Sequence, residues 1–118
     1  MTRILLAEDD DSLRNFLARA LERAGYEVRS CADGDEAVAA LPEQHWDLLL
    51  TDIVMPGADG IEVAREAAQR QPELRIMFIT GFAAVALSAA QATPQAKVLS
   101  KPVHLRDLVA EVERMIAA

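Results

Sequence analysis

Five short apolar runs alternate with five helical patterns along the chain, and this alternation most constrains the fold. The expected strands cover residues 4–7, 27–31, 46–51, 75–79 and 96–99. Strands this apolar, joined by helices, are typical of a parallel sheet that is covered on both faces. Right-handed crossovers between such strands produce a doubly wound arrangement. The pattern therefore predicts an α/β fold with a doubly wound, five-stranded parallel sheet and helices on both faces.

The helices between these strands are expected from apolar residues that recur at helical spacing. They cover residues 13–24, 34–41, 61–70, an alanine-rich stretch before Pro94, and 105–116. Gly25 is expected to end the first helix, and Asp10 or Asp11 is expected to cap its start. Asp33 and Glu36 have capping-box spacing before the second helix.

Length and composition limit the classes of protein to consider. The chain has 118 residues, of which 52% are apolar, so we expect one domain over residues 1–118 with no output domain. The net charge of −7 argues against a nucleic-acid partner. A single cysteine excludes an intrachain disulfide and favours the cytoplasm. No apolar run reaches the roughly 18 residues of a membrane span, so no membrane partner is expected.

Polar residues follow four of the five expected strands, at the point where each strand ends. Glu8 and Asp9 follow the first strand, Asp52 the third, Thr80 the fourth and Lys101 the fifth. The carboxyl ends of parallel strands meet at one edge of a sheet, where ligands of such folds bind. Three carboxylates, a hydroxyl and an ammonium are therefore expected together. Hard oxygen ligands suit Mg²⁺, and Asp52 is a candidate to accept a phosphoryl group.

Each of these residues also has an ordinary structural explanation. An aspartate after a strand often starts a turn or caps a helix, and a threonine there suits β structure. Lys101 is one of two lysines and precedes Pro102. A surface lysine before a proline is common, yet an ammonium at a strand end can also neutralise phosphate oxygens. Singly these signals are weak, but their order on successive strand ends is specific.

These residues resemble the receiver domain of bacterial response regulators, and the resemblance covers the whole chain. The matching features are Glu8-Asp9, Asp52, Met55-Pro56-Gly57, Asp59-Gly60, Thr80-Gly81 and Lys101-Pro102. The resemblance implies that Asp52 receives a phosphoryl group from a histidine kinase or a histidine phosphotransferase. It implies a regulator that catalyses only its own phosphorylation and dephosphorylation, with no other enzymatic activity.

The resemblance also assigns roles to individual residues. It implies that Asp9, Asp52 and the backbone carbonyl of Val54 bind Mg²⁺, while Glu8 holds a metal-bound water. It implies that Thr80 and Lys101 bind phosphate oxygens after activation. The same resemblance implies a cis peptide bond between Lys101 and Pro102.

The chain departs from the family pattern at one position on the fifth strand. Receivers often carry Tyr or Phe three residues before the lysine, and this side chain turns inward as the threonine moves. The position is Val98 in this chain. The usual aromatic switch is therefore expected to be absent or replaced.

A narrower resemblance concerns the first and fourth strands. Residues 4–12 and 76–84 are similar to those of single-domain CpdR-type regulators, which act as phosphorylation-controlled adaptors of the ClpXP protease. This similarity implies the ClpX unfoldase and protease substrates as partners. The pair Ala117-Ala118 is also similar to the tags that ClpX-type unfoldases engage.

Other functions compete with this interpretation. An aspartyl-nucleophile phosphotransferase enzyme usually carries a second aspartate two residues after the nucleophile, but position 54 is valine. A flavodoxin-like cofactor binder needs a phosphate-cradling loop after the first strand, where this chain carries carboxylates. A receiver that has lost its acceptor function fits poorly, because no member of the phosphoryl-accepting set is missing. A receiver that binds a flagellar motor or another regulator stays open.

Two further expectations concern apolar residues near the strand ends. In receivers, the residues two positions after the phosphoryl acceptor and two positions after the threonine flank the path of hydrolytic water. The resemblance places Val54 and Phe82 there, and because both are apolar, slow loss of the phosphoryl group is expected. Residues 82–87 are an unbroken apolar run, and one helical face can bury only part of such a run. A partly exposed patch that binds a partner is one interpretation, and packing under the segment that ends at Pro94 is the other.

Overall fold

The computed structural model describes residues 1–117, so Ala118, the last residue of the expected domain and of the tag-like pair, lies outside the described residues. The elements are β1 (Arg3–Ala7), α1 (Asp11–Arg23), β2 (Glu27–Cys31), α2 (Gly34–Ala40), a 3₁₀ turn (Leu41–Glu43), β3 (Leu48–Asp52), α3 (Gly60–Arg70), β4 (Arg75–Thr80), α4 (Ala83–Ala92), β5 (Lys97–Ser100) and α5 (Leu105–Ala117).

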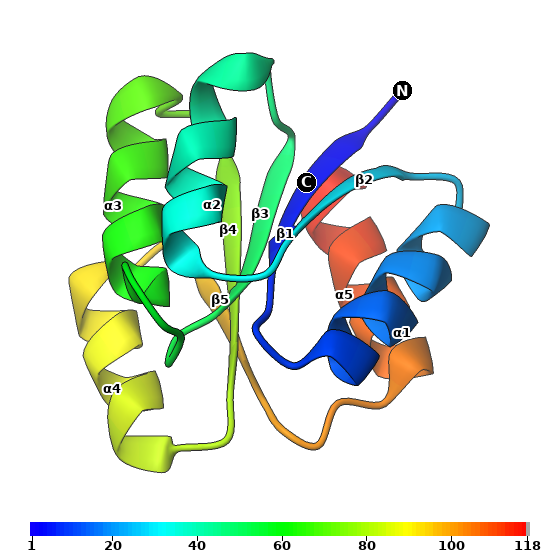
Figure 1. The fold of residues 1–118 in the computed structure, drawn as a ribbon. Helices are drawn as coiled ribbons and strands as arrows, with labels where there is room; N and C mark the ends of the chain where they lie inside the picture. Colours follow the sequence, from blue (N-terminus) through cyan, green and yellow to red (C-terminus); the bar gives the residue numbers. More distant parts are fainter. Residues whose placement is uncertain (118) are drawn as a thin grey trace.

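The five strands form one parallel sheet in the order β2-β1-β3-β4-β5. Helices α2, α3 and α4 cover one face of this sheet, and α1 and α5 cover the other (Figure 1). This arrangement confirms the predicted doubly wound α/β fold. All the strands run in the same direction, so their carboxyl ends lie along one edge, which is the lower edge in Figure 1.

Alternation along the central strands divides the core into two layers. Leu5, Leu49 and Phe78 belong to the layer under α2, α3 and α4, whereas their neighbours Leu6 and Leu50 belong to the layer under α1 and α5. Every residue of β3 is buried, as expected for a central strand between two helical layers. This rigid centre carries Asp52 at its end.

The expected third strand began at Trp46, but β3 begins two residues later at Leu48. The Trp46 indole nitrogen donates hydrogen bonds to the carbonyls of Ala40 (3.3 Å) and Leu41 (3.2 Å). The Trp46 amide donates to the Gln71 side chain, 2.9 Å away. Trp46 is therefore fixed against the end of α2 and has no place in the strand ladder.

The second helix ends at Ala40, one residue before the expected end, and a 3₁₀ turn follows. Pro42 lies in that turn, and a proline cannot donate the backbone hydrogen bond that would continue an α-helix. The first two helices begin with the caps that the sequence predicts. Asp10 caps α1 and Asp33 caps α2, each by accepting a backbone hydrogen bond three residues on.

Among residues 1–117, no helix combines the length and the apolar character that crossing a bilayer requires.

Candidate functional site

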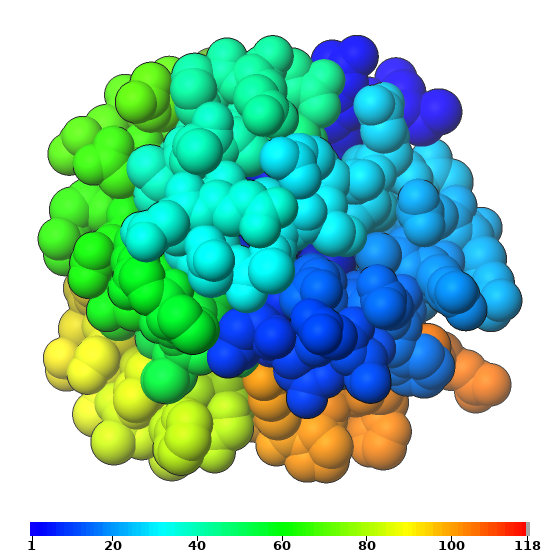
Figure 2. Space-filling model, in the orientation of Figure 1, coloured from blue at the N-terminus to red at the C-terminus, as the bar shows by residue number. Residues whose placement is uncertain are grey.

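The structure brings the predicted polar residues together at the carboxyl edge of the sheet. Carboxylate oxygens of Glu8, Asp9 and Asp52 lie within 4.8 Å of one another. Glu8 follows β1 directly, and Asp52 is the last residue of the neighbouring strand β3. Figure 2 shows the surface near this edge, where segments from distant parts of the chain, in blue, green and orange, adjoin. The parallel topology thus produces the acidic cluster that the sequence predicts.

Lys101 extends from the end of β5 to the two buried carboxylates. Its ammonium nitrogen lies 2.9 Å from Asp52 Oδ2 and 3.1 Å from Glu8 Oε1. Burial lowers the pKa of Lys101, but its hydrogen bond to Asp52 and the negative charges of Asp52 and Glu8 outweigh burial and raise it overall. Lys101 therefore stays charged and offsets part of the negative charge of the cluster. The peptide bond between Lys101 and Pro102 is cis, as predicted.

Glu8 is the most deeply buried carboxylate of the cluster, with no exposed surface. Burial raises the pKa of Glu8 to about 6 from its ordinary 4.5, and the nearby Asp52 charge adds to the rise, although a hydrogen bond from the Asp10 amide opposes it. Glu8 Oε2 accepts that hydrogen bond at 3.1 Å. Glu8 Oε1 accepts no hydrogen bond of good geometry from residues 1–117, although Lys101 is close.

The cluster fits a hard divalent cation. The three carboxylates carry more negative charge than the single Lys101 ammonium offsets, and buried charge is costly unless an opposite charge compensates it. Glu8 and Asp52 are buried, whereas Asp9 is exposed, so the cluster is open to solvent on one side. Oxygen donors with an open side suit Mg²⁺, which keeps several waters and takes one or two carboxylates.

Asp52 is held firmly at the end of β3. Its side chain accepts a hydrogen bond from the Ile53 amide at 2.7 Å, and the Thr51 hydroxyl donates to its backbone carbonyl at 2.7 Å. Gly60 packs flat against this point, because a β-carbon there would lie only 2.2 Å from the Asp52 carbonyl oxygen. Val54, two residues further on, is about half exposed at 49%. The role of its carbonyl as a metal ligand stays a prediction.

Thr80 ends β4, beside the strand that carries Asp52. Its residue is almost fully buried, and its hydroxyl oxygen accepts a hydrogen bond from the Phe82 amide at 3.1 Å. The Thr80 carbonyl accepts a hydrogen bond from the Lys101 amide at 2.8 Å. Thr80 therefore connects the acidic edge to the start of α4.

The position of the usual aromatic switch is occupied differently. Val98 is partly buried and pairs in register with Phe78 on β4. Phe78 is fully buried in the layer beneath α4. An aromatic side chain is thus present in this region, but it comes from the neighbouring strand and is already inside the core.

Two residues near the acidic edge were not predicted from the sequence. The Arg14 guanidinium on α1 donates a hydrogen bond to the Glu8 carbonyl at 2.9 Å, and its ion pair with Asp11 at 2.6 Å holds it there. Asp35 on α2 accepts a hydrogen bond from the Ala58 amide in the loop after β3, at 3.0 Å. The spacing of Asp11 and Arg14 signals only a helical ion pair. Nothing local signals the contact between Asp35 and Ala58.

The apolar run 82–87 is partly exposed, as one of the two interpretations predicted. Phe82 is 59% exposed and Leu87 is 62% exposed, while Val85 packs partly against the core. Ala89 is the buried residue of α4. The helix therefore presents an uncharged, mostly apolar surface beside Thr80.

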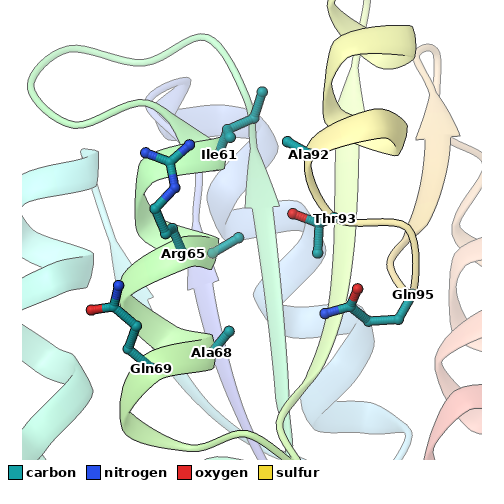
Figure 3. Close-up of a pocket in the computed structure, with 8 residues that line it drawn as sticks. Ile61, Arg65, Ala68, Gln69, Ala92, Thr93 and Gln95 are labelled. Carbon is teal, nitrogen blue, oxygen red and sulfur yellow. The ribbon is translucent and has the colours of Figure 1, made fainter.

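A hollow elsewhere on the surface lacks the chemistry of the acidic edge. Figure 3 shows it between α3, which carries Arg65 and Gln69, and the end of α4, which is followed by Thr93 and Gln95. None of its lining residues belongs to the acidic cluster.

Comparisons with known proteins agree with this geometry. The family model of the response regulator receiver domain matches residues 4–113. The chain is 60% identical over 119 residues to the response regulator receiver protein CpdR of Brucella abortus, covering 100% of this chain and 99% of that protein.

Two solved structures extend the agreement. The response regulator TrrA of Thermotoga maritima, in complex with Mg²⁺ and BeF, is 28% identical with a TM-score of 0.87, covering 98% of this chain and 99% of that one. A CheY-like receiver domain protein of Methanospirillum hungatei is 28% identical with a TM-score of 0.92, covering 99% and 94%.

The burial of Glu8 predicts a pH dependence of stability. A folded-state pKa of about 6, above the ordinary 4.5, means that the folded protein holds a proton that the unfolded chain has released. The contribution of Glu8 to stability therefore falls as the pH rises through this window. Above it, Glu8→Gln should stabilise the metal-free protein by at most about 2 kcal/mol, and the difference should vanish at lower pH.

Chemical unfolding in EDTA, followed across this pH window, measures the difference between wild type and Glu8→Gln. Glu22→Gln, which alters an exposed carboxylate on α1, is the matched control and should show no such trend. If the free energies of unfolding of wild type and Glu8→Gln differ by the same amount at every pH, the raised pKa of Glu8 is contradicted.

Proposed function

Because this chain belongs to the response regulator receiver domain family, we propose that Asp52 is its phosphoryl-accepting residue and that the acidic cluster binds Mg²⁺. The observation that carries the proposal is the position of Asp52, with its carboxylate within 4.8 Å of those of Glu8 and Asp9 and 2.9 Å from the Lys101 ammonium. An aspartate that only starts a turn would not require two further carboxylates and an ammonium around its side chain.

The proposed step is the transfer of a phosphoryl group from a phosphohistidine of a partner protein. A carboxylate oxygen of Asp52 attacks the phosphorus, so that an O–P bond forms as the P–N bond to the imidazole breaks. The electron pair of the broken bond stays on the imidazole nitrogen. The product on this chain is an acyl phosphate, which water later hydrolyses to inorganic phosphate and the free carboxylate.

Residues of this chain prepare the acceptor for that step. Lys101 contacts Asp52 Oδ2 and can move with little displacement to an oxygen of the incoming phosphoryl group. The hydrogen bond from Ile53 to Asp52 fixes the orientation of the carboxylate. Asp9, Asp52 and the Val54 carbonyl would bind Mg²⁺, and Glu8 would hold a metal-bound water. Mg²⁺ held there would supply positive charge that offsets the negative charge of the phosphoryl oxygens.

Thr80 is proposed to couple phosphorylation of Asp52 to a change in the position of α4. Its hydroxyl oxygen bonds to the Phe82 amide, and Phe82 is the N-cap residue of α4. When the hydroxyl turns to a phosphoryl oxygen, this hydrogen bond is lost. The N-terminus of α4 has no side-chain cap to replace it, so the helix can shift.

The proposed output is a protein–protein interaction made in the cytoplasm by the surface of this receiver domain. A histidine kinase or histidine phosphotransferase is the proposed donor, and no enzymatic activity beyond its own phosphorylation and dephosphorylation is proposed. Identity of 60% to CpdR over nearly its whole length supports the role of a ClpXP adaptor. The uncharged surface of α4 supports ClpX or a protease substrate as the partner.

The phosphoryl acceptor is tested directly by labelling. Incubation with acetyl phosphate and Mg²⁺ should modify Asp52, and mass spectrometry locates the group. Asp52→Ala should lose the label, whereas Asp107→Ala, which alters an exposed aspartate on α5, should keep it. Undiminished labelling of Asp52→Ala would contradict the proposed function.

The phosphoryl group should persist for longer than in receivers with polar residues at the two flanking positions. Val54 and Phe82 are both apolar and exposed, so neither can orient a water molecule. The double variant Val54→Asn, Phe82→Glu should lose phosphate about tenfold faster, which corresponds to about 1.4 kcal/mol of the barrier. Leu87→Glu is the control on the same helix. Equal lifetimes for wild type and the double variant would refute this explanation.

The exposed surface of α4 should be needed for partner binding. Leu87→Asp places a charge in this apolar patch and should weaken binding to ClpX about 30-fold, the effect of losing one strong contact. Phe16→Asp is the control, because Phe16 is an exposed aromatic on the opposite helical layer. Both variants should still accept phosphate. Pull-down with and without beryllofluoride measures binding, and unaltered binding by Leu87→Asp would rule out the patch.

A further inference from the structure

The first turn of α2 is attached to the loop that follows β3, outside the acidic cluster. The Gly34 amide donates a hydrogen bond to the Pro56 carbonyl at 3.3 Å. One residue on, the Asp35 carboxylate accepts a hydrogen bond from the Ala58 amide at 3.0 Å. These two bonds join segments more than twenty residues apart in the sequence, as Figure 2 shows where the cyan start of α2 meets the green loop.

Two glycines make this contact close. A β-carbon on Gly34 would lie 1.6 Å from the Ala58 carbonyl oxygen, and one on Gly57 would lie 2.4 Å from an oxygen of Asp35. Gly57 also has a φ of +73°, which other residues rarely adopt. The loop is therefore seated against α2 in one position, and Asp35 contacts it at both Gly57 and Ala58.

The other side of the same loop is fixed to β3. The Gly60 amide donates a hydrogen bond to the Ile53 carbonyl at 2.8 Å, and Gly60 packs flat on the Asp52 carbonyl. Between these two attachments lies Val54, whose half-exposed side chain contributes little packing. The direction of the Val54 carbonyl therefore depends on how firmly the loop ends are held.

We infer that Asp35 is a positioning residue, which holds the loop after β3 so that the Val54 carbonyl and the Asp52 carboxylate face the cation together. This inference rests on the proposed function, because it concerns the same Mg²⁺ site. Mg²⁺ demands nearly ideal octahedral geometry, so a small displacement of one ligand weakens binding. Loss of a solvent-exposed hydrogen bond, by contrast, has a small effect on global stability.

Three variants separate this role from simpler explanations. Asp35→Ala removes the acceptor of the Ala58 amide. Asp35→Asn keeps a carbonyl oxygen at that place but removes the charge. Gly25→Ala is the stability control. Gly25 has a φ of +101°, so an alanine there strains the backbone, and the added β-carbon would contact no atom within 4 Å.

The measurement is the dissociation constant of Mg²⁺ alone, from amide chemical shifts of Asp9 and Asp52, with hydrogen exchange of the Ala58 amide in the metal-free protein. Asp35→Ala should bind Mg²⁺ about tenfold more weakly, as loss of an outer-shell contact typically does, and its Ala58 amide should exchange faster. Asp35→Asn should bind within about twofold of wild type, because it restores the acceptor. Gly25→Ala should bind like wild type although it melts at a lower temperature.

Equal Mg²⁺ affinity for Asp35→Ala and wild type would overturn the inference and leave the proposed function intact. Weak binding by Asp35→Asn as well would also overturn it, because charge and not the hydrogen bond would then be responsible. Weak binding by Gly25→Ala would assign the effect to general stability. A wild-type protein that fails to bind Mg²⁺ at Asp9 and Asp52 would overturn the inference together with the proposed metal site.

Discussion

The structure depends on how two buried carboxylates are tolerated at the end of a hydrophobic sheet. Glu8 directly follows β1 and Asp52 ends the neighbouring strand β3, and both are buried, which disfavours their charges. Lys101 contacts both of them, which offsets part of this cost. One oxygen of Glu8 still lacks a hydrogen bond among residues 1–117. Three carboxylates, of Glu8, Asp9 and Asp52, therefore face one ammonium, and the negative charge that remains at this edge favours a cation.

The fold and the assembly of the acidic edge were predictable from the sequence, because both follow from strand order. Once apolar runs alternate with helices, residues directly after the strands must share an edge, and Glu8, Asp9 and Asp52 do so. The limits of individual elements were less predictable. Trp46 is an aromatic residue beside an apolar run, which favours a strand. In the structure its indole donates hydrogen bonds to carbonyls at the end of α2, and it lies outside the hydrogen-bond ladder of β3.

The parts of the site that the sequence did not predict depend on contacts between distant segments. Asp35 looks like an ordinary residue in the first turn of a helix, and only the tertiary structure places it against Ala58. Phe78 looks like any core residue of a strand, and its place beside Val98 follows from the register of β4 and β5. The roles proposed for Thr80, Lys101 and the Val54 carbonyl stay predictions, because they concern a modified state.

A crystal structure of the protein with Mg²⁺ and beryllofluoride tests the central claim most directly. The account predicts beryllofluoride on a carboxylate oxygen of Asp52, Mg²⁺ against Asp9 and Asp52, and the Lys101 ammonium moved from Asp52 Oδ2 to a fluoride. A structure in which Mg²⁺ lies elsewhere, or in which Lys101 still contacts an unmodified Asp52 at saturating beryllofluoride, would contradict it.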